Sequence, residues 1–146
     1  MEDHIGYVLK QLQQALRAAM DEALRGRGLT TPQYATLTWL AAGGALSGAE
    51  LARRSFVTPQ TMNGIIVNLE AAGLVVRHID PSDARVLQAD LTLAGRDRLD
   101  DCQQAIDAIE EQMVSGLRIE ERQRLLDALH RCVTALSATV EPGART

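Results

Sequence analysis

Two short helices, each opened by its own capping residue, lie close together in residues 47–73, and this pair constrains the fold more than any other feature. Ser47 stands three residues before a glutamate, which is the spacing of a capping box. Thr58 and Pro59 combine a hydroxyl N-cap with proline at the first helical position, and Gly73 marks the stop of the helix that they open. Two short helices with a tight connection predict a helix-turn-helix.

The pattern changes from helical to strand-like directly after Gly73. Residues 74–79 are rich in branched aliphatic side chains, and residues 80–83 read Asp-Pro-Ser-Asp, a strong turn signal. Residues 86–91 then alternate between two faces, as a half-buried strand does. We therefore expect a β-hairpin with a longish tip, placed as a wing beside the helix-turn-helix.

Helical stripes of apolar residues flank this region on both sides. Thr31-Pro32 repeats the cap-plus-proline device and predicts a helix that ends at Gly43-Gly44, and Thr92 is expected to cap a long helix that runs to about Ser115. Two further apolar stripes cover residues 5–25 and about 120–140. Long terminal helices of this kind need a cover, most simply a second copy of the chain.

The predicted fold is mainly α with a small β-hairpin wing: a winged helix-turn-helix plus an N- and C-terminal helical dimerisation region. The predicted domains are an N-terminal dimerisation helix, a DNA-binding lobe, C-terminal dimerisation helices and a flexible tail, in residues 1–30, 31–91, 92–140 and 141–146.

Composition limits the class of partner. The formal net charge is −4 and aromatic residues make up 3% of the chain, so a DNA-binding surface would have to be local. No apolar run is long enough for a membrane span and no signal peptide is apparent, which predicts a cytoplasmic protein without a membrane partner. No phosphate loop, metal-ligand spacing or catalytic carboxylate pair is apparent, so we expect no enzyme, no cofactor and no metal.

The wing carries a specific string: Asp83-Ala84-Arg85 is followed after five residues by Leu91-Thr92. Upstream, in register, stand Ser-Gly-Ala-Glu-Leu-Ala from residue 47, Val-Thr-Pro-Gln-Thr-Met from residue 57 and Leu-Glu-Ala-Ala-Gly-Leu-Val from residue 69. Together these strings resemble the MarR family of bacterial regulators over residues 30–95. The resemblance implies a dimer that binds a pseudo-palindromic operator on double-stranded DNA, commonly as a repressor released by a small, often phenolic, ligand.

The helix opened by Thr58 is then the recognition helix, whose first turns reach base edges in the major groove. Its polar candidates for base or phosphate contacts are Thr58, Gln60, Thr61 and Asn63. The alternative is a capped surface helix with solvated polar side chains.

At the wing tip, Arg85 is expected to enter the minor groove, with Asp83 holding its side chain by a charge-assisted hydrogen bond. The alternative is an ordinary ion pair in a turn. Candidate phosphate contacts are Arg53, Arg54 and Arg77, although each is equally well explained as a surface charge.

One departure from the family concerns the charge of the recognition helix. No lysine or arginine occurs from Ser55 to Val76, and Gly64 and Asn68 stand where many relatives carry a base. Phosphate binding must then depend on helix N-termini and backbone amides. A winged-helix dimer that has lost DNA binding and acts in protein interaction is therefore a rival hypothesis.

Two further pairs of residues concern the signal that would release the protein from DNA, and each pair has two interpretations. Tyr34 and Trp39 are candidates to line a pocket for an aromatic ligand, with ordinary core packing as the alternative. Cys102 and Cys132 lie on or beside apolar stripes, where core or interface packing is the simpler interpretation. A DNA-binding regulator switched by oxidation of these two thiols is the second rival hypothesis.

Overall fold

The computed structural model describes residues 1–140, the side chains as far as residue 138. The predicted tail at 141–146 lies outside the described residues. Six helices and three strands follow one another along this part of the chain: α1 (Ile5–Arg25), α2 (Thr31–Gly43), β1 (Leu46–Ser47), α3 (Gly48–Arg54), α4 (Pro59–Ala71), β2 (Val75–Asp80), β3 (Asp83–Leu91), α5 (Leu93–Met113) and α6 (Ile119–Val140). The predicted fold class, mainly helical with a small wing, is confirmed.

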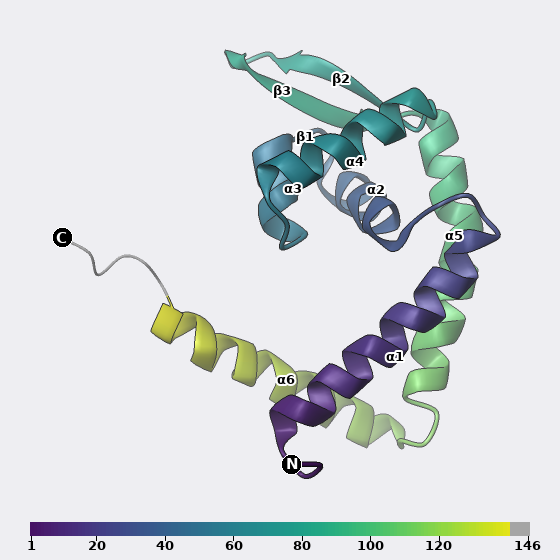
Figure 1. Ribbon diagram of the computed structural model, residues 1–146, viewed down its shortest axis with the longest axis vertical. Coiled ribbons are helices and arrows are strands. Elements are labelled where there is room, and N and C mark those ends of the chain that lie inside the picture. The colour runs from purple at the N-terminus through teal and green to yellow at the C-terminus, as the bar shows by residue number, and fades with distance from the viewer. Residues whose placement is uncertain (141–146) are drawn as a thin grey trace. The chain divides into compact units, whose positions relative to one another are not determined.

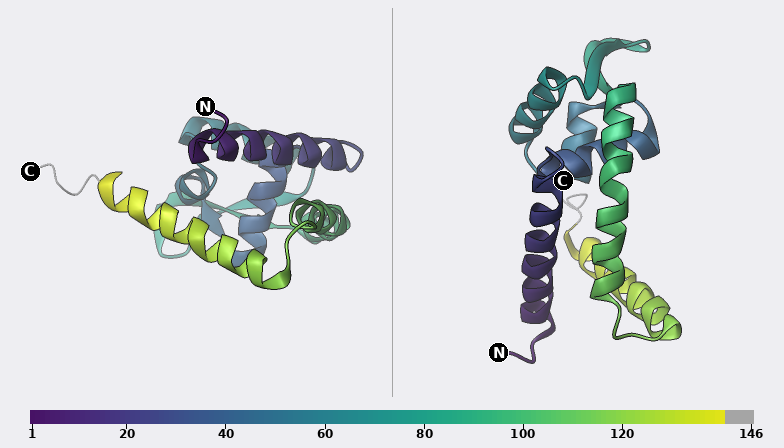
Figure 2. Two further views of the ribbon diagram at one scale, coloured as in Figure 1. Left: turned by 90° about the horizontal axis from the view of Figure 1, so that it is seen from below. Right: turned by 90° about the vertical axis from the view of Figure 1, so that its right-hand side faces the viewer.

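The chain forms two compact units that divide after residue 109. In the first unit, α2, α3, α4 and the three strands form what we call the winged lobe, with the hairpin of β2 and β3 projecting beyond α3 and α4 (Figure 1). Figure 2 shows α1 and α5 as straight helices that extend away from α2, α3 and α4. The second unit holds the end of α5 and α6, where Arg122 pairs with Glu111 at 2.9 Å.

The core of the first unit is aliphatic, as the scarcity of aromatic residues predicts. It joins the buried faces of α2, α3 and α4 to the end of α1 and the first half of α5. Its fully buried large side chains include Leu24, Leu37, Leu40, Leu51, Met62, Leu69, Val75 and Cys102.

The helix starts follow local hydrogen bonding. Thr58 caps α4 as predicted, with its Oγ1 accepting the Thr61 amide at 3.1 Å. The predicted cap of α2 at Thr31 is wrong by one residue: Thr30 is the N-cap, because Gln33 completes a capping box with it. At Ser47 the cap forms, but Glu50 turns its carboxylate to Arg54 instead of back to the Ser47 amide.

The wing is antiparallel with strand order β1-β3-β2. Asp80 pairs with Asp83, so only Pro81 and Ser82 form the turn, and the expected longish tip is wrong. The short strand β1, in which Leu46 pairs with Ala89, was not predicted, because two residues carry no periodic signal.

The start of α5 is fixed to the base of the wing. The Thr92 hydroxyl accepts the Gly95 amide at 3.0 Å, which is the predicted cap, and donates to the Gly73 carbonyl at 2.7 Å. The helix approaches so closely here that a Cβ on Gly95 would lie 2.0 Å from the Leu74 carbonyl oxygen. Gly95 is therefore required by packing, not by a turn.

Candidate nucleic-acid interface

The N-terminus of α4 presents a short polar surface. The Thr58 hydroxyl accepts the Thr61 amide and donates to the Thr61 hydroxyl at 3.0 Å, so the two side chains hold each other. Thr58, Gln60 and Thr61 are all exposed. The positive end of the helix dipole favours an anion at this position, which suits a phosphate or an electronegative groove edge.

One face of α4 is buried and the opposite face is open to solvent. Met62, Ile66 and Leu69 pack in the core. The open face carries no cation, since the region from Ser55 to Val76 has none. Any base contact made by this face must therefore be made without a cationic side chain.

Asn63 and Arg77, two of the predicted DNA contacts, are brought together by the fold. Arg77, on β2, donates to Asn63 Oδ1 at 3.2 Å and to Glu70 Oε1 at 3.2 Å, and its side chain is only 24% exposed. Both residues line a small hollow of about 220 Å³ beside Gly48 and Leu87. The Arg77 guanidinium thus links the wing to α4 by hydrogen bonds, and its positive charge is paired with the Glu70 carboxylate.

The wing tip has the arrangement predicted for Asp83 and Arg85. Asp83 accepts the Arg85 amide at 3.0 Å and two guanidinium hydrogen bonds at 3.1 and 3.2 Å. Because Arg85 donates to it, the pKa of the Asp83 carboxyl lies below its ordinary value. The Arg85 side chain is 90% exposed, so the carboxylate orients an arginine that contacts little else in the chain.

Arg54 and Trp39 form a contact that the sequence reasoning did not anticipate. The Arg54 guanidinium carbon lies 5.4 Å from the centroid of the Trp39 ring, and its Nε is 2.9 Å from Glu50 Oε1. Arg53 also pairs with Glu50 and remains 73% exposed. Of these two candidate phosphate contacts, Arg53 has the more accessible charge.

Tyr34 and Trp39 do not form one pocket. Five helical positions separate them, which places their side chains about 140° apart around α2. Tyr34 is buried, and its hydroxyl is 3.2 Å from Gln103 Oε1 on α5, whereas Trp39 is 36% exposed. Burial also raises the pKa of Tyr34.

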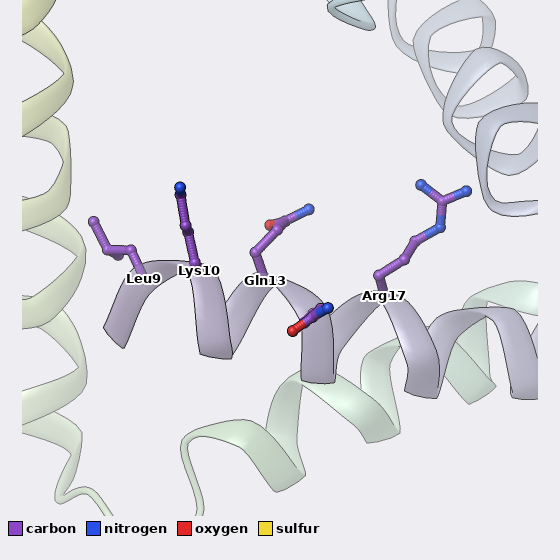
Figure 3. Close-up of a pocket in the computed structure, with 5 residues that line it drawn as sticks. Leu9, Lys10, Gln13 and Arg17 are labelled. Carbon is purple, nitrogen blue, oxygen red and sulfur yellow. The ribbon is translucent and has the colours of Figure 1, made fainter. Parts of the chain in front are cut away.

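A separate hollow of about 730 Å³ runs along α1 (Figure 3). It is open to solvent, and the side chains that line it come from positions spaced along one side of the helix. They are Leu9, Lys10, Gln13, Gln14 and Arg17.

The two cysteines differ in environment. Cys102 is fully buried in the core, and desolvation raises the pKa of its thiol. Cys132, on α6, is exposed. In residues 1–140 no group of three or more His, Cys, Asp or Glu side chains is placed to hold a metal, and no helix there is both long and apolar enough to cross a membrane.

Phe56, in the turn between α3 and α4, was missed by the sequence reasoning. Its φ is 56°, the left-handed region that bulky residues rarely adopt, and its side chain is 96% exposed. A phenylalanine in a helix-turn-helix turn, where glycine would fit without strain, is the signal that could have found it.

Comparison with known proteins identifies relatives of the whole fold. A family model described as MarR family matches residues 27–86. The HTH-type transcriptional repressor Rv2887 of Mycobacterium tuberculosis is 44% identical over 92 residues, which cover 63% of this chain and 66% of that protein, just under two thirds of its length. The HTH-type transcriptional repressor NicR of Pseudomonas putida is 30% identical over 131 residues, 90% of this chain and 83% of NicR.

Solved structures agree with these sequence relationships. A probable transcriptional regulator from Pseudomonas aeruginosa superposes with a TM-score of 0.81 at 32% identity, covering 90% of this chain and 98% of that one. Rv2887 has been solved in complex with DNA, with a TM-score of 0.74 at 31% identity, covering 88% of this chain and 97% of that one. It has also been solved in complex with salicylic acid, with a TM-score of 0.72 at 33% identity, covering 90% of this chain and 99% of that one. The chain belongs to the MarR family of transcriptional regulators.

Proposed function

We propose that this chain is a homodimeric repressor that binds a pseudo-palindromic operator and is released by a small aromatic ligand. The observation that carries the proposal is the pairing of an exposed, Thr58-capped recognition helix with an outward Arg85 held by Asp83. A relative at 31% identity has been solved on DNA, which supports the same role for these elements here.

On DNA, α4 enters the major groove, where Gln60 and Thr61 reach base edges and Thr58 lies near a phosphate. Arg85 enters the minor groove, where narrow A·T stretches attract a cation. Asn63 has its amide oxygen engaged by Arg77, which leaves its NH₂ group as the donor toward a base. Arg77 and Arg54 act mainly by fixing the lobe, since both are paired with glutamates.

For dimerisation we propose residues 1–30 and 92–140, which flank the DNA-binding lobe at 31–91. Apolar side chains on α1 and α6 are exposed in the single chain, among them Ile5, Val8, Leu126 and Val133. Such faces are stabilised by burial against a second copy. A two-fold dimer presents its recognition helices about 34 Å apart, one turn of DNA, which requires a pseudo-palindromic operator.

The first experiment measures operator affinity of wing variants by fluorescence anisotropy. Arg85→Ala should weaken binding by about 1–3 kcal/mol without unfolding the dimer, and Asp83→Ala should weaken it less because the arginine is only misplaced. If neither variant alters affinity, the wing does not contact DNA.

The second experiment follows affinity with salt. Few arginines are available to displace counterions, so log K should fall with log salt concentration at a slope of about −4 for the dimer. A slope as steep as about −8 would place the DNA on another surface. Absence of specific binding at any salt would favour the protein-interaction dimer.

The effector is tested with the single tryptophan of the chain. Salicylate, which Rv2887 binds in its solved complex, is the first probe, followed by other small aromatic carboxylates and phenols. A ligand that releases the operator and quenches Trp39 emission would support an aromatic site near α2. Release without any change in emission would exclude Trp39 from that site.

Thiol oxidation remains a second candidate because Cys132 is exposed. Cys102 is unsuited to it, since a buried thiol with a raised pKa forms little thiolate. The variant with both cysteines changed to Ser should still release DNA with the effector. Peroxide-driven release that disappears in this variant would instead support the redox switch.

A further inference from the structure

We propose that the open face of α4 reads thymine methyl groups in the major groove, with Gly64 allowing close approach of the helix backbone and Val67 packing against a methyl group. This inference rests on the proposed DNA-binding function. It assigns the operator a chemical preference and names two specificity-determining residues that lack any hydrogen-bonding side chain.

The face is defined by the helix period. Gln60, Gly64, Val67 and Ala71 follow one another at spacings of four, three and four residues, so they lie within about 60° around the helix axis. All four are exposed. The centre of the face that the lobe presents outward therefore carries one amide side chain and three small or apolar positions.

Gly64 is not required by the packing of the chain itself. A Cβ built at this position would meet nothing within 4 Å, and no positive φ is recorded there. Glycine is among the least favourable residues in a helix interior, so alanine would suit the isolated fold better. Open space at a helix glycine fits a surface that another backbone or a base pair must approach closely.

Val67 is 42% exposed on the same face. In the major groove an exposed aliphatic group has one complementary feature, the C5-methyl group of thymine. Guanine is most often read by arginine or lysine, and α4 has neither. Gln60 at the start of the face suits adenine, the partner of thymine, so both side chains favour the same A·T pairs.

The test uses an operator selected from a random duplex library with the full-length protein. We expect thymine at a fixed position in each half-site. Replacing these two thymines with deoxyuridine, which lacks only the methyl group, should weaken binding about fourfold per half-site and about fifteenfold for both, since one buried methyl-sized group is worth about 0.8 kcal/mol. Deoxyuridine in the flanking sequence is the DNA control.

The protein side of the test asks whether Val67 is the partner of the methyl group. Val67→Ala should lose most of its discrimination between the thymine and deoxyuridine operators. Val76→Ala is the matched control: Val76 is 49% exposed, and strand alternation points it away from the Arg77 side that contacts α4. It should bind both operators as the wild type does.

Gly64→Ala separates a DNA-contact role from a structural one. The melting temperature should rise, because a favourable helix former replaces glycine in open space, while operator affinity should fall about tenfold as the added methyl group holds the helix away. Unchanged affinity in Gly64→Ala, or equal wild-type affinity for thymine and deoxyuridine operators, would overturn this inference and leave the repressor proposal intact. Failure of the wild type to bind any duplex would overturn both.

Discussion

The winged lobe, the first half of α1 and α6 contain the same kind of aliphatic side chains at the same helical spacing, yet the lobe buries them and the other two segments leave them exposed. Leu37 and Leu40 of α2 are 0% and 1% exposed, whereas Leu125 and Leu126 of α6 are 40% and 48% exposed. None of the described side chains of α6 is buried, and residues 5–15 of α1 are all exposed. Helical periodicity therefore identifies an apolar face but not what covers it.

This difference separates two sources of stability. The lobe buries its core within one chain, so its folding should not depend on protein concentration. The first half of α1 and α6 expose apolar area that contributes stability only when another surface covers it. Four predictions test this division, from the largest expected effect to the smallest.

The largest effect is expected at Gly95. Gly95→Ala would put a Cβ 2.0 Å from the Leu74 carbonyl oxygen, so α5 must move away from the base of the wing. We expect a loss of about 3 kcal/mol or more of unfolding free energy by urea denaturation, the upper end of overpacking costs.

Gly6→Ala is the matched control on α1, because a Cβ there meets nothing within 4 Å. It should leave stability unchanged or raise it by up to about 1 kcal/mol. Equal effects at both glycines would show that the close approach of α5 to the lobe is absent in solution.

A cavity in the lobe is the next test, and its expected effect is similar in size to that of Gly95→Ala. Leu37→Ala should cost about 2–5 kcal/mol of unfolding free energy at every protein concentration, because the side chain is fully buried. Leu126→Ala, at a half-exposed position on α6, should cost less, and its cost should shrink as the protein is diluted. A Leu126→Ala loss as large as that of Leu37→Ala, independent of concentration, would contradict the division.

Dimer formation is tested by a charge on α6. Val133 is 62% exposed, and Val133→Asp should raise the dimer dissociation constant tenfold or more, about 1.4 kcal/mol for each tenfold, by light scattering. Thr134→Asp is the control for this variant, because it adds the same charge at the next position, which is also exposed. A wild type that is monomeric at micromolar concentration would remove the homodimer from the proposal.

The smallest effect is expected where α1 joins the lobe. Thr31 donates to Asp21 at 2.5 Å, and this bond, followed by Arg17, lowers the pKa of the Asp21 carboxyl below its ordinary value of 3.8. A carboxyl whose pKa is lower in the folded chain contributes fully to stability above its ordinary pKa of 3.8, and the contribution is lost as pH falls through the lowered pKa of the folded state.

Asp21→Asn should therefore be slightly less stable than the wild type at pH 7, and the difference should shrink as pH falls below 3.8. Thermal melts across this range measure the difference. Thr31→Val removes the donor and should flatten the same pH dependence. A wild-type advantage that persists at the acid end would assign the contact a role other than ionisation.

Much of the fold could be predicted because the signals are local. The Thr58 cap, the Asp-Pro-Ser-Asp turn and the Thr92 cap each depend on a few neighbouring residues. The need for glycine at residue 95 could not be predicted, because its reason lies in the Leu74 carbonyl, more than twenty positions away in the chain. The choice between Thr30 and Thr31 as cap depends on Gln33, whose side-chain oxygen accepts the Thr30 amide, and this signal is equally local.

The candidate site was less predictable because its arginines are assigned by tertiary contacts. The sequence singles out Arg85 beside Asp83 but gives Arg54 and Arg77 only as equivalent surface cations. Folding pairs Arg54 with Glu50 beside Trp39, pairs Arg77 with Glu70 and Asn63, and leaves Arg85 extended. The pairing of Asp83 with Arg85 was predictable because the two residues are two positions apart.

The attachment of α5 to the wing has a mechanical consequence. The attachment is tight because it consists of two hydrogen bonds and one close backbone approach. Thr92 donates to the carbonyls of Gly73 and Leu74, and Gly95 packs against the Leu74 carbonyl oxygen. Within the first unit, residues 93–109 of α5 form a helix about 26 Å long, so a tilt of about 5° displaces the far end of this segment by about 2 Å. Because these contacts hold the start of α5 against the base of the wing, we expect a tilt of this segment to rotate the hairpin that carries Arg85.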